Sequence, residues 1–240
     1  MAEHGAATRP VHLLHDAKAL ARMLAVDMPC CSHVAMSTQG PAAAFAAFVE
    51  GNPLAEGWVI DAELPTRRIV SWSGTLADGL FDDEPRTWMR AGQQRFAEFL
   101  DGIAPALEAH RRTLCLRPHH RHAMGDVHAC MRVLRERAGG PFEVMLAPAD
   151  MMAPSMLAQA EDHLARMFAH LGPTAAAVLL SDAAETPETA ETGLFSSVRF
   201  GEGRLPHALV AQLLADHVPP ETPVILLPGA IDAQRAALGL

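Results

Sequence analysis

Short runs of consecutive apolar residues recur along the chain and are the clearest pattern in the sequence. Eight of these runs are rich in β-branched and aliphatic residues, which predicts strands. Their residues are continuously apolar and do not alternate with polar ones, which is typical of strands buried on both faces of a parallel sheet. The predicted strands cover residues 11–14, 32–36, 58–61, 68–72, 113–117, 142–146, 176–180 and 223–227.

Several segments between these strands repeat their apolar residues every three or four positions, which predicts amphipathic helices. Pro41, Pro154 and Pro206 mark expected helix starts, because the first turn of a helix does not need the amide hydrogen that proline lacks. Strands and helices therefore alternate, which favours a parallel α/β fold. The helices with the clearest apolar stripe cover residues 91–110, 127–137 and 156–171.

The number of strands favours a single (β/α)8 TIM barrel over residues 1–240, since such barrels need about 250 residues. An open sheet with helices on both faces is the alternative. Two segments fit the barrel less well. The link at residues 62–67 is too short for a crossover helix, which usually needs about a dozen residues. Residues 181–204 are polar and rich in Thr, Glu and Pro, which predicts a long loop at the end of a strand.

The composition narrows the class of function. The chain has 240 residues, 50% of them hydrophobic, and a formal net charge of -9 at pH 7. Because an acidic surface does not attract phosphates, nucleic acid is not an expected partner. We find no apolar stretch of the roughly 18 residues that a membrane span needs, and no export signal, so no membrane partner is expected. The four cysteines contain no Cys-x-x-Cys pair, which indicates reduced thiols in a cytoplasmic protein.

From about residue 67 onwards, the order of motifs resembles the xylose-isomerase-like family of TIM barrels, which are sugar phosphate isomerases and epimerases. The segment RRIVSWSG is similar to the family's fourth strand, and TLCLRPHH to the next strand with its closing histidine. The likeness continues through residues 124–152, through TAAAVLLSD at 174–182 and through the glycine loop and helix at 200–214. It covers roughly two thirds of the chain at the level of motifs.

The resemblance implies a divalent metal held by glutamate, aspartate, histidine and glutamate at successive strand ends. Such a metal would polarise the oxygens of a sugar while a carboxylate moves a proton between carbons. In this chain the four positions read Arg117, Ala147, Leu179, and Leu227 or Pro228. None of these residues is an ordinary ligand for a hard cation, so we expect no metal and no other cofactor.

Other positions covered by the resemblance keep polar residues. His119 and Asp182 match the family pattern and are our candidate catalytic residues, although Asp182 could instead cap the next segment. The Gly-Glu-Gly turn at 201–203 matches a loop on the phosphate or sugar side, and a simple tight turn is its alternative. The candidate substrate-binding residues are Arg117, His120, Asp150, Arg199, Gly201 and Gly203.

The densest polar cluster, Arg-Pro-His-His-Arg-His at residues 117–122, directly follows a predicted strand. Because a guanidinium at a strand end offers a fixed fork of donors, Arg117 predicts an anion site at the barrel mouth. An exposed polar loop is one alternative. A metal site made of His119, His120 and His122 is another, although their spacing differs from the paired histidines of zinc sites.

Two classes of function remain open. The first is a sugar phosphate isomerase or epimerase-like barrel that binds a sugar or an anionic, phosphorylated metabolite at its C-terminal rim, with the usual metal ligands lost. The second is a non-catalytic pseudoenzyme that uses the same rim to bind a metabolite or a partner protein. Whether the protein forms a homo-oligomer is not indicated by the sequence.

Overall fold

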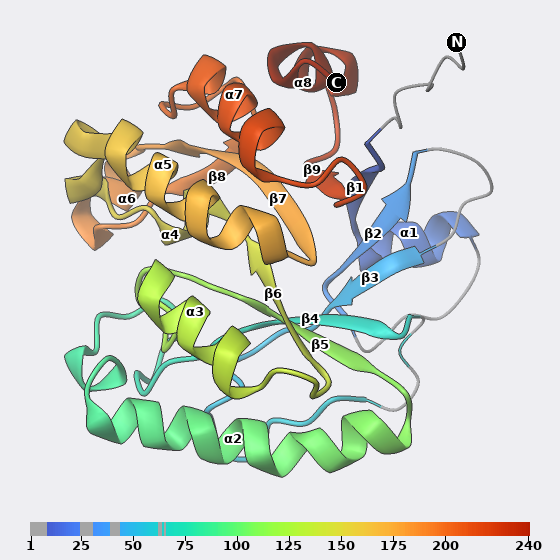
Figure 1. The fold of residues 1–240 in the computed structure, drawn as a ribbon, viewed down its shortest axis with the longest axis vertical. Helices are drawn as coiled ribbons and strands as arrows, with labels where there is room; N and C mark the ends of the chain where they lie inside the picture. The colour runs from blue at the N-terminus through green and yellow to red at the C-terminus, as the bar shows by residue number, and fades with distance from the viewer. Residues whose placement is uncertain (1–8, 25–30, 39–43, 62–63, 65) are drawn as a thin grey trace, which may run out of the picture.

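Eight strands of the computed structural model close into a barrel, and helices surround it (Figure 1). The structure describes residues 9–24, 31–38, 44–61, 64 and 66–240. The strands are β1 (Val11–Asp16), β2 (His33–Ser37), β3 (Ala44–Phe48), β4 (Arg68–Trp72), β5 (Thr113–Arg117), β6 (Phe142–Leu146), β7 (Ala177–Ala184), β8 (Ser196–Arg199) and β9 (Val224–Leu226). The ring runs β1-β2-β3-β4-β5-β6-β7-β9, and β9 pairs with β1 to close it. The expected TIM barrel is confirmed.

The helices follow the predicted stripes closely. They are α1 (Ala17–Leu24), α2 (Arg90–Ala109), α3 (Val127–Glu136), α4 (Pro148–Met151), α5 (Ala160–Leu171), α6 (Pro187–Thr192), α7 (His207–His217) and α8 (Ile231–Leu238), with 3-10 turns η1 (Pro85–Thr87), η2 (Pro154–Gln159) and η3 (Gly172–Thr174). The stripe expected at 156–171 is divided between η2 and α5. Within the part of the chain that the structure describes, no helix has the length and apolar character that crossing a membrane requires.

The expectation of a fully parallel sheet was wrong for one strand. β2 runs antiparallel to both of its neighbours, β1 and β3. Only residues 38–43 connect β2 to β3, and a parallel connection needs about a dozen residues or more. Between β1 and β2, the amide of Ala17, directly after β1, donates to the carbonyl of Ser32, directly before β2, over 2.8 Å. The chain therefore leaves the sheet after β1 and enters it again for β2 at the same end. The start of β2 therefore lies at the C-terminal end of β1.

The predicted strand at 58–61 was also wrong. These residues are irregular, and Val59 is 79% exposed. The third strand is β3, within a segment where we expected a helix beginning at Pro41, which itself lies outside the described residues. Alanine has a low strand propensity, but Ala46 fits the narrow barrel interior, and pairing with β2 and β4 decides the conformation. Residues 49–67 connect β3 to β4, and those of them that the structure describes form no helix; Trp58 packs edge-on against Phe99 of α2.

The segment expected as a loop at 181–204 contains regular structure. Its first residues extend β7, α6 follows, and β8 then returns antiparallel to β7, outside the ring. Thr186 caps α6 by accepting from the amide of Thr189, and Gly193 ends the helix in a left-handed conformation with φ of 66°. These capping residues made the segment polar, so its composition was mistaken for that of an unstructured loop.

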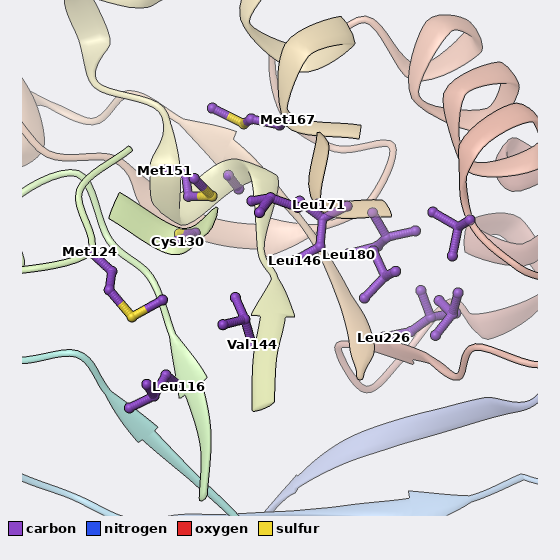
Figure 2. Close-up of a cluster of buried hydrophobic side chains, with 14 of the residues drawn as sticks. Leu116, Met124, Cys130, Val144, Leu146, Met151, Met167, Leu171, Leu180 and Leu226 are labelled. Atoms are coloured by element: carbon purple, nitrogen blue, oxygen red, sulfur yellow. The ribbon is translucent and has the colours of Figure 1, made fainter. Parts of the chain in front are cut away.

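Two apolar layers hold the barrel. The inner layer consists of inward-facing side chains from every strand of the ring, many of them small: Leu14, Ala35, Ala46, Phe48, Val70, Cys115, Met145, Ala147, Ala177, Leu179 and Ile225. The outer layer lies between the strands and the helices. Figure 2 shows part of it, with Leu116, Val144, Leu146, Leu180 and Leu226 of the strands beside Met151, Met167 and Leu171. Because successive side chains of a strand alternate, each strand supplies both layers.

Candidate functional site

The mouth of the barrel opens at the C-terminal ends of β3, β4 and β5. A cavity of about 390 Å³ lies there, and its walls include His33, Glu50, Trp72, Phe81 and Arg117. A groove of about 420 Å³ on the outside, between residues 53–60 and α2, has a mainly apolar wall. We consider the mouth the candidate site, because charged and aromatic side chains from different elements converge in it.

Arg117 is the central charged group of the mouth. Its Nε donates to Oδ2 of Asp150 over 2.7 Å, and its Nη2 donates to Oδ1 over 3.1 Å. The side chains of this pair are 14% and 9% exposed. The guanidinium carbon lies 3.9 Å from the centroid of the Trp72 ring, so one face of the cation is covered by the indole. Two predicted site residues, Arg117 and Asp150, are thus brought together.

Three histidines of the β5–α3 loop lie near this pair. The ring of His119 stacks on His120 at 4.3 Å, and it lies 4.8 Å from the ring of His122. Burial, and then the proximity of the other two imidazoles, hold the pKa of His119 well below its usual range. Burial also lowers the pKa of His120, and it lowers that of His122 to about 4. All three imidazoles are therefore neutral at pH 7.

The same run of residues binds two neighbouring segments of the chain. Nε2 of His122 donates to the carbonyl of Leu80 over 2.8 Å, and Nη1 of Arg121 donates to the carbonyl of Phe81 over 2.5 Å. The other amino group of Arg121 donates to the carbonyl of Thr192 at the end of α6. The β4–α2 loop and the end of α6 are thus bound to one guanidinium, which holds Phe81 against the mouth.

Asp182 belongs to a different polar centre. It has no exposed surface, and the amides of Ala183, Gly201, Gly203 and Leu205 donate to its carboxylate over 2.8–3.2 Å. Nε2 of His207 lies 2.5 Å from Oδ2. The amides of Gly201 and Gly203, in the turn that we considered as a loop on the phosphate or sugar side, are therefore occupied by a side chain of the protein itself. The predicted catalytic role of Asp182 stays a prediction.

The remaining predicted site residues have partners within the chain. Nε of Arg199 donates to Glu202 over 2.8 Å, and this pair is about half exposed. Nδ1 of His119 accepts from the amide of Arg121 over 3.2 Å. His120 contacts the carbonyl of Asp150 through its amide at 3.0 Å, which joins the β5–α3 loop to α4. His119 and His120 thus border the Arg117 mouth, whereas Arg199, Gly201 and Gly203 lie with Asp182.

The positions that would hold a divalent metal do not fit one. Arg117 presents a cation and is already paired with Asp150, while Ala147 and Leu179 belong to the apolar inner layer. Leu227 packs against the same layer. Hard cations need oxygen or imidazole ligands, and none of these side chains supplies one. Among the described residues, no three His, Cys, Asp or Glu side chains are grouped as a metal site.

No family model matches the chain, and no curated protein matches it either. Solved structures do match. A D-tagatose 3-epimerase-like protein has a TM-score of 0.51 at 9% identity, over 80% of this chain and 73% of that one. The chain has the fold of the xylose-isomerase-like TIM barrels. This confirms the resemblance seen in the sequence, at the level of the fold.

Two further matches are looser. D-psicose 3-epimerase, solved in the presence of D-fructose, has a TM-score of 0.46 at 16% identity, over 71% of this chain and 54% of that one. A xylose isomerase-like TIM barrel protein from Mycobacterium smegmatis, in complex with magnesium, has a TM-score of 0.46 at 8% identity, over 72% and 60%. The chain thus spans little more than half the length of these two proteins. At such identities the likeness establishes the fold and not the activity.

Four residues of the mouth were missed by the sequence reasoning: His33, Glu50, Trp72 and Phe81. Trp72 could have been found, because it lies two residues after the inward-facing Val70 and so faces the same side of the sheet. His33 could not. A parallel β2 would place its first residue at the opposite end of the barrel, and only the antiparallel direction brings His33 to the mouth.

Proposed function

We propose that the protein binds a sugar or a sugar-like anionic metabolite in the mouth of the barrel, and that it does so without a divalent metal. The observation that carries this proposal is the position of Arg117, which is held edge-on by Asp150 and flat against Trp72 at the wall of a cavity of about 390 Å³. The names of the matched epimerases support a sugar as the class of ligand.

The donors of Arg117 support this proposal. A guanidinium has five N–H groups, and Asp150 takes one from Nε and one from Nη2. The other three, on Nη1 and Nη2, have no partner among the residues that the structure describes. An end-on fork of donors is therefore available to two ligand oxygens, such as neighbouring hydroxyls or a carboxylate.

The aromatic side chains provide the second part of the recognition. Phe81 meets Trp72 edge-on, with ring centroids 5.2 Å apart, and both line the cavity. Aromatic walls suit the apolar faces of a sugar ring, while charged groups bind its hydroxyls. Glu50 and His33 are the other ionisable groups in the wall. We therefore favour ligand binding over metal-dependent isomerisation, for which the necessary ligands do not converge.

The proposal can be tested with two arginine variants. Arg117→Lys keeps the charge but loses the planar fork, so we expect binding of the best ligand in a panel of ketoses, sugar acids and sugar phosphates to weaken at least about tenfold. Arg68→Lys is the matched control. Arg68 also forms a double hydrogen bond, with Glu143, and also lies over an aromatic ring, that of Phe45, but at the opposite end of the barrel. The Arg68→Lys variant should leave the affinity for the ligand unchanged.

Calorimetry on metal-free protein, repeated with manganese, provides the measurement. We expect saturable binding without metal, and no exchange of sugar C–H protons with solvent deuterium in either condition. Equal effects of the two lysine variants on affinity, or binding that appears only with manganese, would contradict the proposal.

A further inference from the structure

We propose that Asp150 is a specificity-determining residue, which excludes doubly charged, phosphorylated ligands from the mouth and leaves it to uncharged or singly charged ones. This inference rests on the proposed function of the same pocket. It concerns the charge of the ligand, which the fold does not determine.

The ion pair itself supplies the first argument. Asp150 binds Arg117 through both carboxylate oxygens, at 2.7 and 3.1 Å, so the positive charge is compensated before any ligand arrives. Because the two side chains are only 14% and 9% exposed, water screens the carboxylate poorly. A ligand oxygen bound to the free N–H groups of Arg117 would share that guanidinium with the carboxylate of Asp150. The carboxylate would repel the ligand in proportion to the ligand's negative charge.

Asp150 cannot easily move aside. It lies in α4, where its amide donates to the carbonyl of Ala147 over 3.1 Å. Its own carbonyl accepts from the amide of His120 over 3.0 Å. The neighbouring Pro148 and Ala149 are buried. Since the backbone is held on both sides, the carboxylate is fixed beside Arg117.

The other charges of the mouth do not compensate a dianion. Glu50 in the cavity wall adds a negative charge, and Asp16 lies close enough to influence His33. Arg121 is the nearby cation, and backbone carbonyls take both of its amino groups. The histidines beside Arg117 are neutral at pH 7, as shown above. A phosphate would therefore meet one paired arginine and a surrounding excess of carboxylates.

Titration with inorganic phosphate tests the inference. Wild-type protein should bind phosphate weakly, and Asp150→Asn should bind it at least about tenfold more tightly, because a poorly screened negative charge is removed from beside Arg117. The isosteric amide can still accept one hydrogen bond from the guanidinium. Asp162→Asn is the control, since it removes an equal charge from an exposed ion pair with Arg166 on α5, away from the residues that line the mouth, and it should change phosphate affinity less than about threefold.

The double variant Arg117→Lys/Asp150→Asn should lose most of the gain if that gain is transmitted through the arginine. Should Asp150→Asn fail to fold by circular dichroism, Asp150→Ser replaces it in the same titration. Tight phosphate binding by the wild type, no gain in the Asp150 variant, or an equal gain in Asp162→Asn would overturn the inference. If sugar binding still depends on Arg117 in these cases, the specificity role alone fails. Sugar binding that does not depend on Arg117 means that the proposed function fails.

Discussion

Arg68 and Arg117 occupy comparable environments at opposite ends of the β4–β5 pair. Each forms two hydrogen bonds with an acid, and each lies over an aromatic ring at 4.6 or 3.9 Å. Beyond Arg68, the ring of Phe45 stacks on that of His12 at 4.4 Å, which fills the interior at this end. Beyond Arg117 lies the open cavity. The role of an arginine here depends on the space next to it, not on its own partners.

His122 should make the protein sensitive to acid. Its ring is fully buried. Nε2 carries a proton and donates a hydrogen bond to the carbonyl of Leu80, while Nδ1 has no partner among the described residues. Burial lowers its pKa to about 4, so the unfolded state binds more protons between pH 6.5 and 4. The contribution of neutral His122 to the free energy of unfolding should be fully present above pH 6.5. As the pH falls towards 4, this contribution should be lost, which lowers the free energy of unfolding by up to about 3 kcal/mol.

The measurement is denaturant unfolding of wild-type protein and of His122→Gln at pH 7 and pH 4.5. The glutamine amide can still donate to the carbonyl of Leu80 but does not titrate, so the loss at the lower pH should be smaller in the variant. His170→Gln, at an exposed position of α5, should keep the wild-type pH dependence. An unchanged pH dependence in His122→Gln would show that other groups control the acid sensitivity.

At the scale of elements, Asp182 organises the connection from β8 to α7. The amides of Gly201, Gly203 and Leu205 all point at its carboxylate. A Cβ at position 203 would overlap that carboxylate, whereas a Cβ at Gly102 in α2 would meet no atom within 4 Å.

Alanine at these two glycines should therefore have opposite effects. Gly203→Ala should lower the free energy of unfolding by about 2 kcal/mol or more, because it displaces a buried, hydrogen-bonded carboxylate. Gly102→Ala should raise it by up to about 1 kcal/mol, since alanine favours the helix. Urea unfolding of both variants checks the prediction, and a neutral Gly203→Ala would mean that the turn is not held by Asp182.

The errors in the predicted elements share a cause. Residues 58–61 have the apolar composition of a strand, but no strand in the described part of the chain pairs with them. The AFAAF segment of β3 looks helical by composition, yet it lies between β2 and β4 and forms a strand. Strand formation depends on partners that are distant in the sequence, whereas the helices α2 and α3 carry their apolar stripe locally.

On the scale of the whole molecule, Arg9 helps to close the barrel. Its guanidinium donates to the carbonyls of Leu214, Val218, Pro219 and Thr222 over 2.8–3.3 Å. These contacts join the start of β1 to the end of α7 and to the residues before β9, beside the pairing of β1 with β9. One side chain thus connects the segments that lead into the first and last strands of the ring.

Arg9→Met should lower the free energy of unfolding by about 1–3 kcal/mol, because it leaves partly buried carbonyls without their donors. Arg166→Met is the control, since Arg166 forms an exposed pair with Asp162 on α5, and such pairs contribute roughly 0–1 kcal/mol. The two variants are compared by guanidinium unfolding. Equal losses of the free energy of unfolding in the two variants would show that Arg9 stabilises the closed barrel no more than an ordinary surface charge does.

The sequence by itself determined the barrel and the positions of α2 and α3, because apolar periodicity and strand ends are local features. It also drew attention to the polar cluster at residues 117–122, whose role in binding stays a prediction. It also brought Arg117 and Asp150 into consideration as residues of one rim. Only the tertiary structure decided that β2 is antiparallel, that His33 and Glu50 therefore join Trp72 at the mouth, and that Asp182 is enclosed by its own loop. These outcomes depend on chain direction and on which groups meet after folding, and local patterns in the sequence do not reveal either of them.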